Sequence, residues 1–237
     1  MKTFRSSSLS GHRAAFSLIE LLSVMAIIGM LTVAAVPALN SINSSGGVTK
    51  AGYDIGGLLE QARAFAMARN TYVFVGVAEV DGAQPESAVQ TSAGVGRVVV
   101  AAVASKSGRK NMDPSNLVPV SKAFRFDNIH LADQLSTSGN LARPTVDSSN
   151  KVGSDSFIAN TSYAFQWPVS GNAKYSFKKV ICFSPSGAAS NDIATGDFAR
   201  WMEVGLVEAR GNSIPVTLNA AAVQLDGVTG SVNIYRP

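Results

Sequence analysis

The chain has 237 residues, is 46% hydrophobic and only 15% charged, and carries a formal net charge of +4. A typical protein has about 25% charged residues, so this composition favours a folded or membrane-associated protein over a disordered one. The single cysteine, Cys182, excludes an intramolecular disulfide, and with only His12 and His130 a site of two histidine ligands has little basis, so we expect no catalytic, cofactor or metal site.

The first 15 residues form a basic leader. They contain Lys2, Arg5 and Arg13 and no acidic residue, so the leader holds +3 of the net charge of +4. The remaining chain has a net charge of +1. A nearly neutral chain argues against nucleic acid as the main partner.

A long apolar segment follows the leader. Glu20 is the only charged residue between Phe16 and Leu39, and the 19 residues from Leu21 onward carry no charge. As a helix, these residues are about 28 Å long, close to the roughly 30 Å of a bilayer's hydrocarbon core. The sequence therefore predicts a transmembrane helix over 16–39. Because basic flanks stay inside, we expect its N-terminus in the cytoplasm and the C-terminal domain on the other side.

Three interpretations of this segment compete. A secretory signal peptide has an apolar stretch of about 7 to 15 residues, shorter than this one, although Val36-Pro37-Ala38 imitates a cleavage site. A plain single-span anchor fits the length better. Neither explains Glu20, because a carboxylate in a spanning segment costs roughly 2.5 to 3.5 kcal/mol at the centre and less near an end.

The third interpretation is removal of the leader after Ala15. The new chain begins with the ammonium group of Phe16, and Glu20 lies four residues later, about one helical turn. In a bundle of identical or related helices, the Glu20 carboxylate can meet a neighbour's ammonium group. Such pairing offsets the desolvation of both charges. Glu20 is then an assembly residue.

The segment Ala15-Phe16-Ser17-Leu18-Ile19-Glu20 resembles the prepilin peptidase recognition motif of type IV pilins and type II secretion pseudopilins. Ala15 stands where that family usually has glycine. The resemblance implies cleavage between Ala15 and Phe16, N-methylation of Phe16, and use of Glu20 in subunit assembly. Pro37 matches a proline that is frequent in the family's membrane helix.

The resemblance also implies a place and a set of partners. The place is the bacterial inner membrane, with a single span, a periplasmic C-terminal domain, and assembly into a periplasmic or surface fibre. The partners are other pilin or pseudopilin subunits, prepilin peptidase, the inner-membrane assembly platform and membrane lipid. The function that it implies is that of a structural subunit rather than an enzyme.

After the apolar segment the sequence predicts a hinge and a second helix. Asn40–Thr49 contains two successive glycines and several residues that compete for backbone hydrogen bonds, so we expect a helix break and place a hinge at 40–52. Pro37 is expected to kink or loosen the preceding helix. Helical spacing then predicts a core-packing stripe at Ile55, Leu58, Leu59, Ala62, Phe65, Ala66 and Arg69, with the helix ending near Asn70.

The remaining chain is rich in short strand patterns separated by loop-like stretches. A long helix followed by many short strands predicts an α+β fold in which the helix covers an antiparallel sheet within a domain at 53–237. The resemblance implies that this fold is pilin-like. The expected strands are 71–78, 97–104, 123–126, 163–167, 179–184, 202–208 and 231–235.

Two further segments carry a narrower resemblance. Leu59–Asn70, followed by a hydrophobic strand, is similar to a pattern of the H-type minor pseudopilins and FimT-like minor pilins. Ile181–Gly187 is similar to a strand of that family that ends in a turn with Phe, Pro and Gly. The region from Asp81 to Lys178 resembles no named family.

Other charged residues are expected on a solvated surface. His130 is interpreted as an ordinary surface or strand-end residue. The acids show no spacing that would pair two of them for acid-base chemistry. They are Asp54, Glu60, Glu79, Asp81 and Glu86.

Two alternatives to a purely structural subunit remain open. Some FimT-like minor pilins bind DNA through a basic patch, and this chain has two basic groups, although three charges each are few for tight phosphate binding. A membrane-anchored or secreted enzyme is the other alternative, but the chain has no recognisable nucleophile motif. The basic groups are Lys106, Arg109 and Lys110, and Lys174, Lys178 and Lys179.

Overall fold

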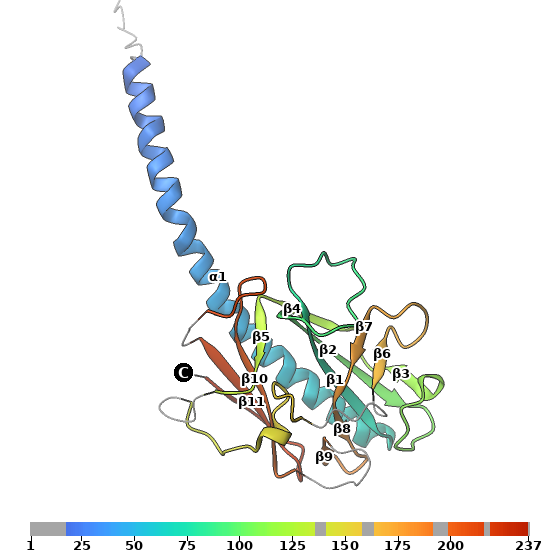
Figure 1. Ribbon diagram of the computed structural model, residues 1–237. Helices are drawn as coiled ribbons and strands as arrows, with labels where there is room; N and C mark the ends of the chain where they lie inside the picture. The colour runs from blue at the N-terminus through green and yellow to red at the C-terminus, as the bar shows by residue number, and fades with distance from the viewer. Residues whose placement is uncertain (1–17, 136–140, 158–163, 192–198, 216–218, 237) are drawn as a thin grey trace, which may run out of the picture. The chain divides into compact units, whose positions relative to one another are not determined.

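The first element is the helix α1, Leu18–Arg69, which is 52 residues long. The computed structural model describes residues 18–135, 141–157, 164–191, 199–215 and 219–236, with the backbone alone for 33–46 (Figure 1). The chain divides into two compact units, Met1–Ile42 and Asn43–Pro237, and α1 contributes to both. Ala15 and Phe16 lie outside the described residues.

The predicted helix break at Asn40–Thr49 is wrong, because the backbone of α1 is helical throughout this segment and also at Pro37. Val48 in this segment and Ala51 just after it are fully buried in the core of the second unit, so packing favours a helix here. Tertiary packing overrides weak helix propensity in such cases. The domain limits predicted for the chain stay a prediction.

The helix ends where the sequence predicts. Asn70 has a φ of 48°, in the left-handed region that asparagine tolerates better than most residues. The amide of Thr71 donates to the carbonyl of Ala66 at 3.1 Å and closes the last turn. The chain can then turn directly into the first strand.

The second unit holds three antiparallel sheets, which confirms the predicted α+β class (Figure 1). A six-stranded sheet has the order β3-β2-β1-β8-β9, with β4 also paired to β2; a four-stranded sheet has the order β12-β11-β10-β5; and β6 pairs with β7. The strands are β1 (Val73–Asp81), β2 (Gly96–Ser105), β3 (Leu117–Pro119), β4 (Phe124–Asp127), β5 (Ile129–Ala132), β6 (Phe165–Trp167), β7 (Tyr175–Phe177), β8 (Lys179–Phe183), β9 (Ala189–Ser190), β10 (Trp201–Glu208), β11 (Ala220–Asp226) and β12 (Val232–Tyr235), with short 3-10 turns at Pro114–Asn116 and Ser148–Asn150.

Each predicted strand overlaps an observed one, and five further strands were not predicted. Among the described residues, the strands that correspond to the predictions are β1, β2, β4, β6, β8, β10 and β12. Those that the sequence patterns missed are β3, β5, β7, β9 and β11.

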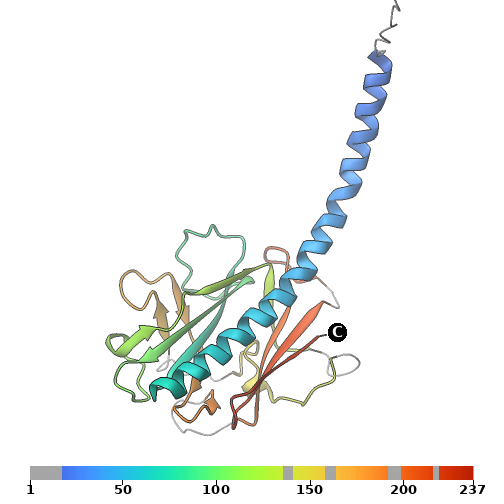
Figure 2. The same ribbon diagram turned by 180° about the vertical axis from the view of Figure 1, so that it is seen from behind.

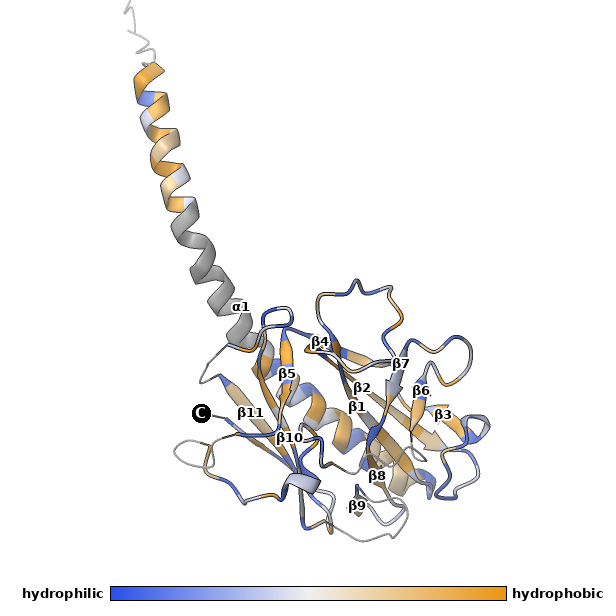
Figure 3. Cartoon of the chain, in the orientation of Figure 1, coloured by the Kyte–Doolittle hydropathy of each residue, from blue (hydrophilic) through white to orange (hydrophobic). Residues whose placement is uncertain are grey.

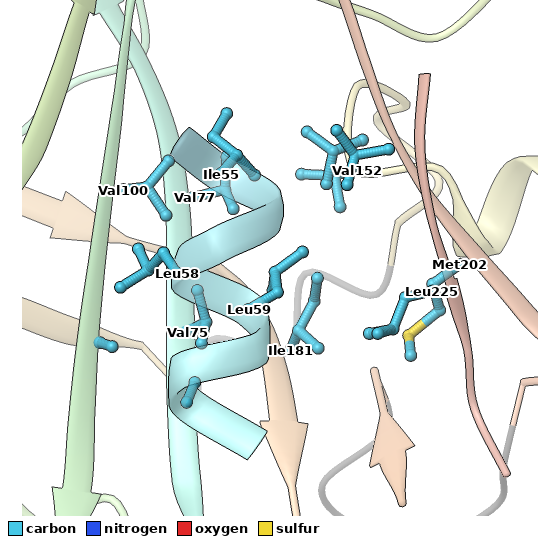
Figure 4. Packing of buried hydrophobic residues seen from close by; sticks show 14 of the residues in the cluster. Ile55, Leu58, Leu59, Val75, Val77, Val100, Val152, Ile181, Met202 and Leu225 are labelled. Atoms are coloured by element: carbon cyan, nitrogen blue, oxygen red, sulfur yellow. The ribbon is translucent and has the colours of Figure 1, made fainter. Parts of the chain in front are cut away.

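The main core lies between α1 and the six- and four-stranded sheets. In Figure 2 the part of α1 that belongs to the second unit crosses both sheets. Ile55, Leu58 and Leu59 point from the helix toward strand residues that include Val75 and Ile181 (Figure 4). Full burial of a Leu or Ile side chain contributes about 1.5–3 kcal/mol. The predicted core-packing stripe is therefore confirmed at these positions and at Ala62 and Ala66.

Gly56 lets the last strand approach this helix closely. A Cβ atom at Gly56 would lie 2.9 Å from Cδ1 of Ile234, a side chain of β12. That separation is shorter than carbon atoms tolerate, so a larger residue would force the Ile234 side chain to move.

A second core covers the other face of the six-stranded sheet. Phe165 and Phe177, from the β6–β7 hairpin, pack with their ring centroids 4.9 Å apart. A Cβ atom at Gly76 would lie 2.5 Å from Cβ of Phe177, so the hairpin sits directly on the glycine of β1. All ten residues of β2 are buried, because the sheet is covered on both faces. The region that resembles no named family therefore supplies a layer of the fold.

Cys182 lies in this second core, and burial raises the pKa of its thiol from 9.0 to about 12. The thiolate is the reactive form, so this shift lowers its population at pH 8 roughly a thousandfold. We expect no reaction of the native chain with a thiol reagent such as dithionitrobenzoate over minutes, and reaction of one thiol per chain in urea. Rapid reaction of one thiol without denaturant would contradict burial of Cys182.

Candidate functional site

The structure describes only two of the four site residues predicted from the sequence. Glu20 lies in the first turn of α1 and is exposed. Pro37 lies within the α1 backbone. The predicted cleavage and methylation residues Ala15 and Phe16 precede the described part of the chain, so their roles stay predictions.

The start of α1 exposes large apolar side chains. The hydroxyl groups of Ser23 and Thr32 donate hydrogen bonds to the helix carbonyls of Glu20 and Ile28, each at 2.8 Å. Because their donors are used within the helix, these two residues add little polarity to its surface. In Figure 3 this part of the helix is mostly coloured as hydrophobic. The exposed apolar residues are Leu18, Ile19, Leu21, Leu22, Val24, Met25, Ile27, Ile28, Met30 and Leu31.

These residues point to every side of the helix, because successive positions of an α-helix are about 100° apart. A soluble surface helix would keep one polar face. Exposure of this much apolar surface in water is unfavourable, and such surfaces mark contact with lipid or with other proteins. Glu20 is the only charged residue in this stretch and lies at its beginning.

Among the described residues, no helix is both long enough and apolar enough to cross a membrane.

Glu79 is not the solvated acid that the sequence suggested, because only 11% of its side chain is exposed. Its carboxylate accepts hydrogen bonds from the amides of Gly96 and Leu131 at 2.9 and 3.2 Å. Nδ1 of His130 lies 2.9 and 3.0 Å from its two oxygens. Glu79 therefore connects β1 to β2 and β5. Glu60 and Glu86 are exposed, as predicted.

A second acid is buried deeper. Glu203 on β10 is 2% exposed, and Arg143 donates to its two oxygens through Nε at 2.7 Å and Nη2 at 2.8 Å. Nε2 of Gln224 on β11 donates to the same carboxylate at 2.8 Å. Burial tends to raise the pKa of Glu203, but the hydrogen bonds from Arg143 and Gln224 outweigh it and leave the pKa below its usual value.

This buried network ties a loop to the four-stranded sheet. Arg143 also donates to the carbonyl of Leu141 at 3.0 Å, and Gln224 donates to that of Pro144 at 2.8 Å. The partners are separated by 60 residues in the chain, so no local motif in the sequence announces the pair. The arrangement holds structure together rather than lining an open site.

At least three of the six cations considered for DNA binding contact groups of their own chain. Nζ of Lys106 donates to the carbonyl of Ser115 at 2.8 Å, and Nζ of Lys179 donates to that of Gly153 at 3.2 Å. Nζ of Lys174 lies 5.5 Å from the centre of the Tyr175 ring. Several of these cations thus have contacts within their own chain, which favours a structural role for them.

Comparison with known proteins identifies one feature, and it lies at the N-terminus. Residues 11–36 match the family described as the prokaryotic N-terminal methylation motif. No curated protein and no solved structure matches the chain. The match includes the predicted cleavage residues, Glu20 and all ten exposed apolar residues at the start of α1. The chain therefore carries a prepilin-type N-terminal methylation motif, which supports the type IV pilin and pseudopilin family and interaction with prepilin peptidase and other pilin subunits.

Proposed function

We propose that the protein is a structural subunit, a minor pseudopilin or pilin-like prepilin, that assembles into a type II secretion pseudopilus or a type IV pilus-like fibre. Prepilin peptidase cleaves between Ala15 and Phe16, and the new Phe16 amine is methylated. The observation that carries this proposal is the exposed, all-round apolar start of α1 with Glu20 as its only charge, within the methylation motif.

The physical basis is an exchange of environments. Before assembly, we propose that 16–39 lies in the inner membrane as a single span with a cytoplasmic N-terminus, where lipid covers the apolar residues. In the fibre, helices of other subunits take the place of lipid, and packing between them replaces lipid contacts. Glu20 then needs a cationic partner, and the Phe16 amine of a neighbouring subunit provides one.

Support for the narrower H-type subfamily comes from the second unit. The two segments that resemble it lie against each other, because a Cβ atom at Gly187 would lie 2.8 Å from Sδ of Met67. Gly187 has a φ of 87°, so glycine fits the turn after β8. We propose an H-type or FimT-like minor subunit on the basis of this packing and the sequence patterns.

Replacement of Glu20 by alanine tests the assembly role. We expect Glu20→Ala to be inserted and cleaved normally, since removal of a charge does not hinder insertion. Incorporation into fibres should fall about tenfold or more, because loss of a charge-assisted contact costs roughly 1.5–3 kcal/mol. The measurement is the fraction of membrane protein recovered in sheared fibres or cross-linked to a neighbouring subunit.

Glu60→Ala is the matched control, since Glu60 is an exposed acid on the same helix. It should leave incorporation unchanged. Incorporation of Glu20→Ala at the wild-type level would overturn the role given to Glu20. A defect of equal size in both variants would point to general loss of charge instead.

A further inference from the structure

A cavity of about 430 Å³ opens on the second unit. Its walls come from β1, β5, β8 and the loops at 91–95 and 153–155. Pockets for small molecules in proteins have volumes of roughly 300–1,000 Å³, so this cavity fits a small ligand. Glu79, His130 and Lys179 are its least exposed charged or titratable residues, and Asp133, Asp155 and Lys178 are exposed around them.

Glu79 fixes the orientation of the His130 ring. A carboxylate only accepts hydrogen bonds, and two backbone amides already donate to it, so Nδ1 of His130 is the donor in the contact at 2.9 Å. In the neutral ring, Nε2 is then an acceptor. Among the described residues, no side chain or backbone group forms a hydrogen bond with this Nε2. Nε2 of His130 is therefore a hydrogen-bond acceptor in the lining of the cavity that the described part of the chain leaves unused.

Lys179 contributes spare donors. Its ammonium group has three N–H donors, and one contact within the described chain uses one of them, on the carbonyl of Gly153 at 3.2 Å. Partial burial lowers the pKa of Lys179, while the charges of Asp155, Glu79 and Asp133 act in the opposite direction. A half-buried cation with unused donors gains from contact with an anionic group.

The exposed acids of the lining can accept contacts from a cationic group. Asp133 and Asp155 are exposed, and within the described part of the chain neither forms an ion pair closer than 4.0 Å. The cavity thus has both cations and anions in its lining. With His130 neutral, three carboxylates and two ammonium groups give its lining a net charge of −1.

We propose that this cavity binds a small zwitterion, an amino acid or short peptide that carries both a free carboxylate and a free ammonium group. The ligand's carboxylate contacts Lys179, its ammonium group contacts Asp133 and Asp155, and a peptide N–H donates to Nε2 of His130. A simple anion would leave Asp133 and Asp155 without a cationic partner, and a simple cation would leave Lys179 without an anionic one. A zwitterion can pair with both the lysines and the carboxylates of the lining.

Calorimetric titration of the full chain in detergent micelles tests this site. The probes are glycylglycine, N-acetylglycylglycine, which lacks the ammonium group, and glycylglycinamide, which lacks the carboxylate. We expect glycylglycine to bind one to one with a Kd below about 1 mM. The two blocked peptides should bind at least about tenfold more weakly, because each leaves one set of charges unpaired.

Variants assign the two ends of the ligand. Lys179→Met should weaken glycylglycine binding about tenfold, and Lys178→Met, at an exposed position, provides a second test should Lys179→Met unfold. Asp133→Asn with Asp155→Asn should remove the preference for glycylglycine over its N-acetyl form. Lys106→Met is the control, because Lys106 lies outside the cavity lining and should not affect binding.

Three results would overturn the proposal. Absence of saturable binding of glycylglycine to the folded wild-type chain would overturn the proposal. Equal affinity for all three peptides would overturn it too, as would unchanged binding in both lysine variants. None of these results bears on cleavage or fibre assembly, which depend on the N-terminal segment.

Discussion

Replacement of Arg143 by methionine is expected to lower the free energy of unfolding by about 3–5 kcal/mol, since removal of one partner of a buried ion pair leaves an uncompensated charge. The side chains of Arg143 and Glu203 are only 1% and 3% exposed. Methionine keeps much of the volume, so the loss comes from the charge rather than from a void. Urea unfolding of the full chain in micelles, followed by tryptophan fluorescence, measures the change.

Arg210→Met is the matched control for this substitution. Arg210 also forms an ion pair, with Glu208 at 3.2 Å, but 69% of its side chain is exposed. Glu208 is 7% exposed, but solvent around the Arg210 guanidinium screens this pair, so the variant should lose clearly less unfolding free energy than Arg143→Met does. Equal losses in the two variants would contradict the importance of burial at Glu203.

The effect of Arg143→Met should also depend on pH. In the wild type the pKa of Glu203 is below its usual 4.5, so the stability that it contributes is present above that value and is lost as pH falls through the folded-state pKa. Without the arginine, burial dominates and favours the neutral acid. The difference in stability between variant and wild type should therefore be largest near neutral pH and smaller at pH 4.

Replacement of Phe177 by alanine is expected to have an effect of similar size. Phe177 is fully buried between the β6–β7 hairpin and the six-stranded sheet. Removal of such an aromatic side chain costs about 3–5 kcal/mol from lost burial and the remaining cavity. The same urea unfolding experiment measures the loss.

Val89→Ala serves as its control, because Val89 lies in the same long region of the chain but is 67% exposed. Its unfolding free energy should change by less than about 0.5 kcal/mol. A loss below about 1 kcal/mol for Phe177→Ala would show that the hairpin is not part of the cooperative fold.

Local patterns predicted the elements that depend on local chemistry. The helical stripe around Leu58 and Leu59 and the helix end at Asn70 follow from spacing and from a residue suited to the left-handed turn. Strands such as β1 and β2 are rich in β-branched residues, so their conformation could be recognised.

Tertiary contacts decided what the sequence could not. The strand β11 begins with three alanines, which have high helix propensity, but its residues are buried between β10 and β12. The segment at Asn40–Thr49 has glycines that favour a break, yet it is helical and its end packs in the core.

The candidate functional residues also differ in whether the sequence alone indicates them. The N-terminal motif is contiguous, so the sequence alone indicates it. The contact between Glu79 and His130 joins residues 51 positions apart, and the contact between Arg143 and Glu203 joins residues 60 apart. Packing between distant parts of the chain creates both contacts, because β1 and β5 belong to different sheets and Arg143 lies in a loop, so single-sequence patterns gave no sign of them.

Mass spectrometry of the N-terminal peptide of the chain purified from membranes tests the prepilin assignment most directly. The expected result is a chain that begins at Phe16, with one methyl group on its amine and residues 1–15 absent. A chain that begins at Leu39 would indicate a signal peptide, and an intact Met1 would indicate a plain anchor. Either of these results would contradict processing as a prepilin.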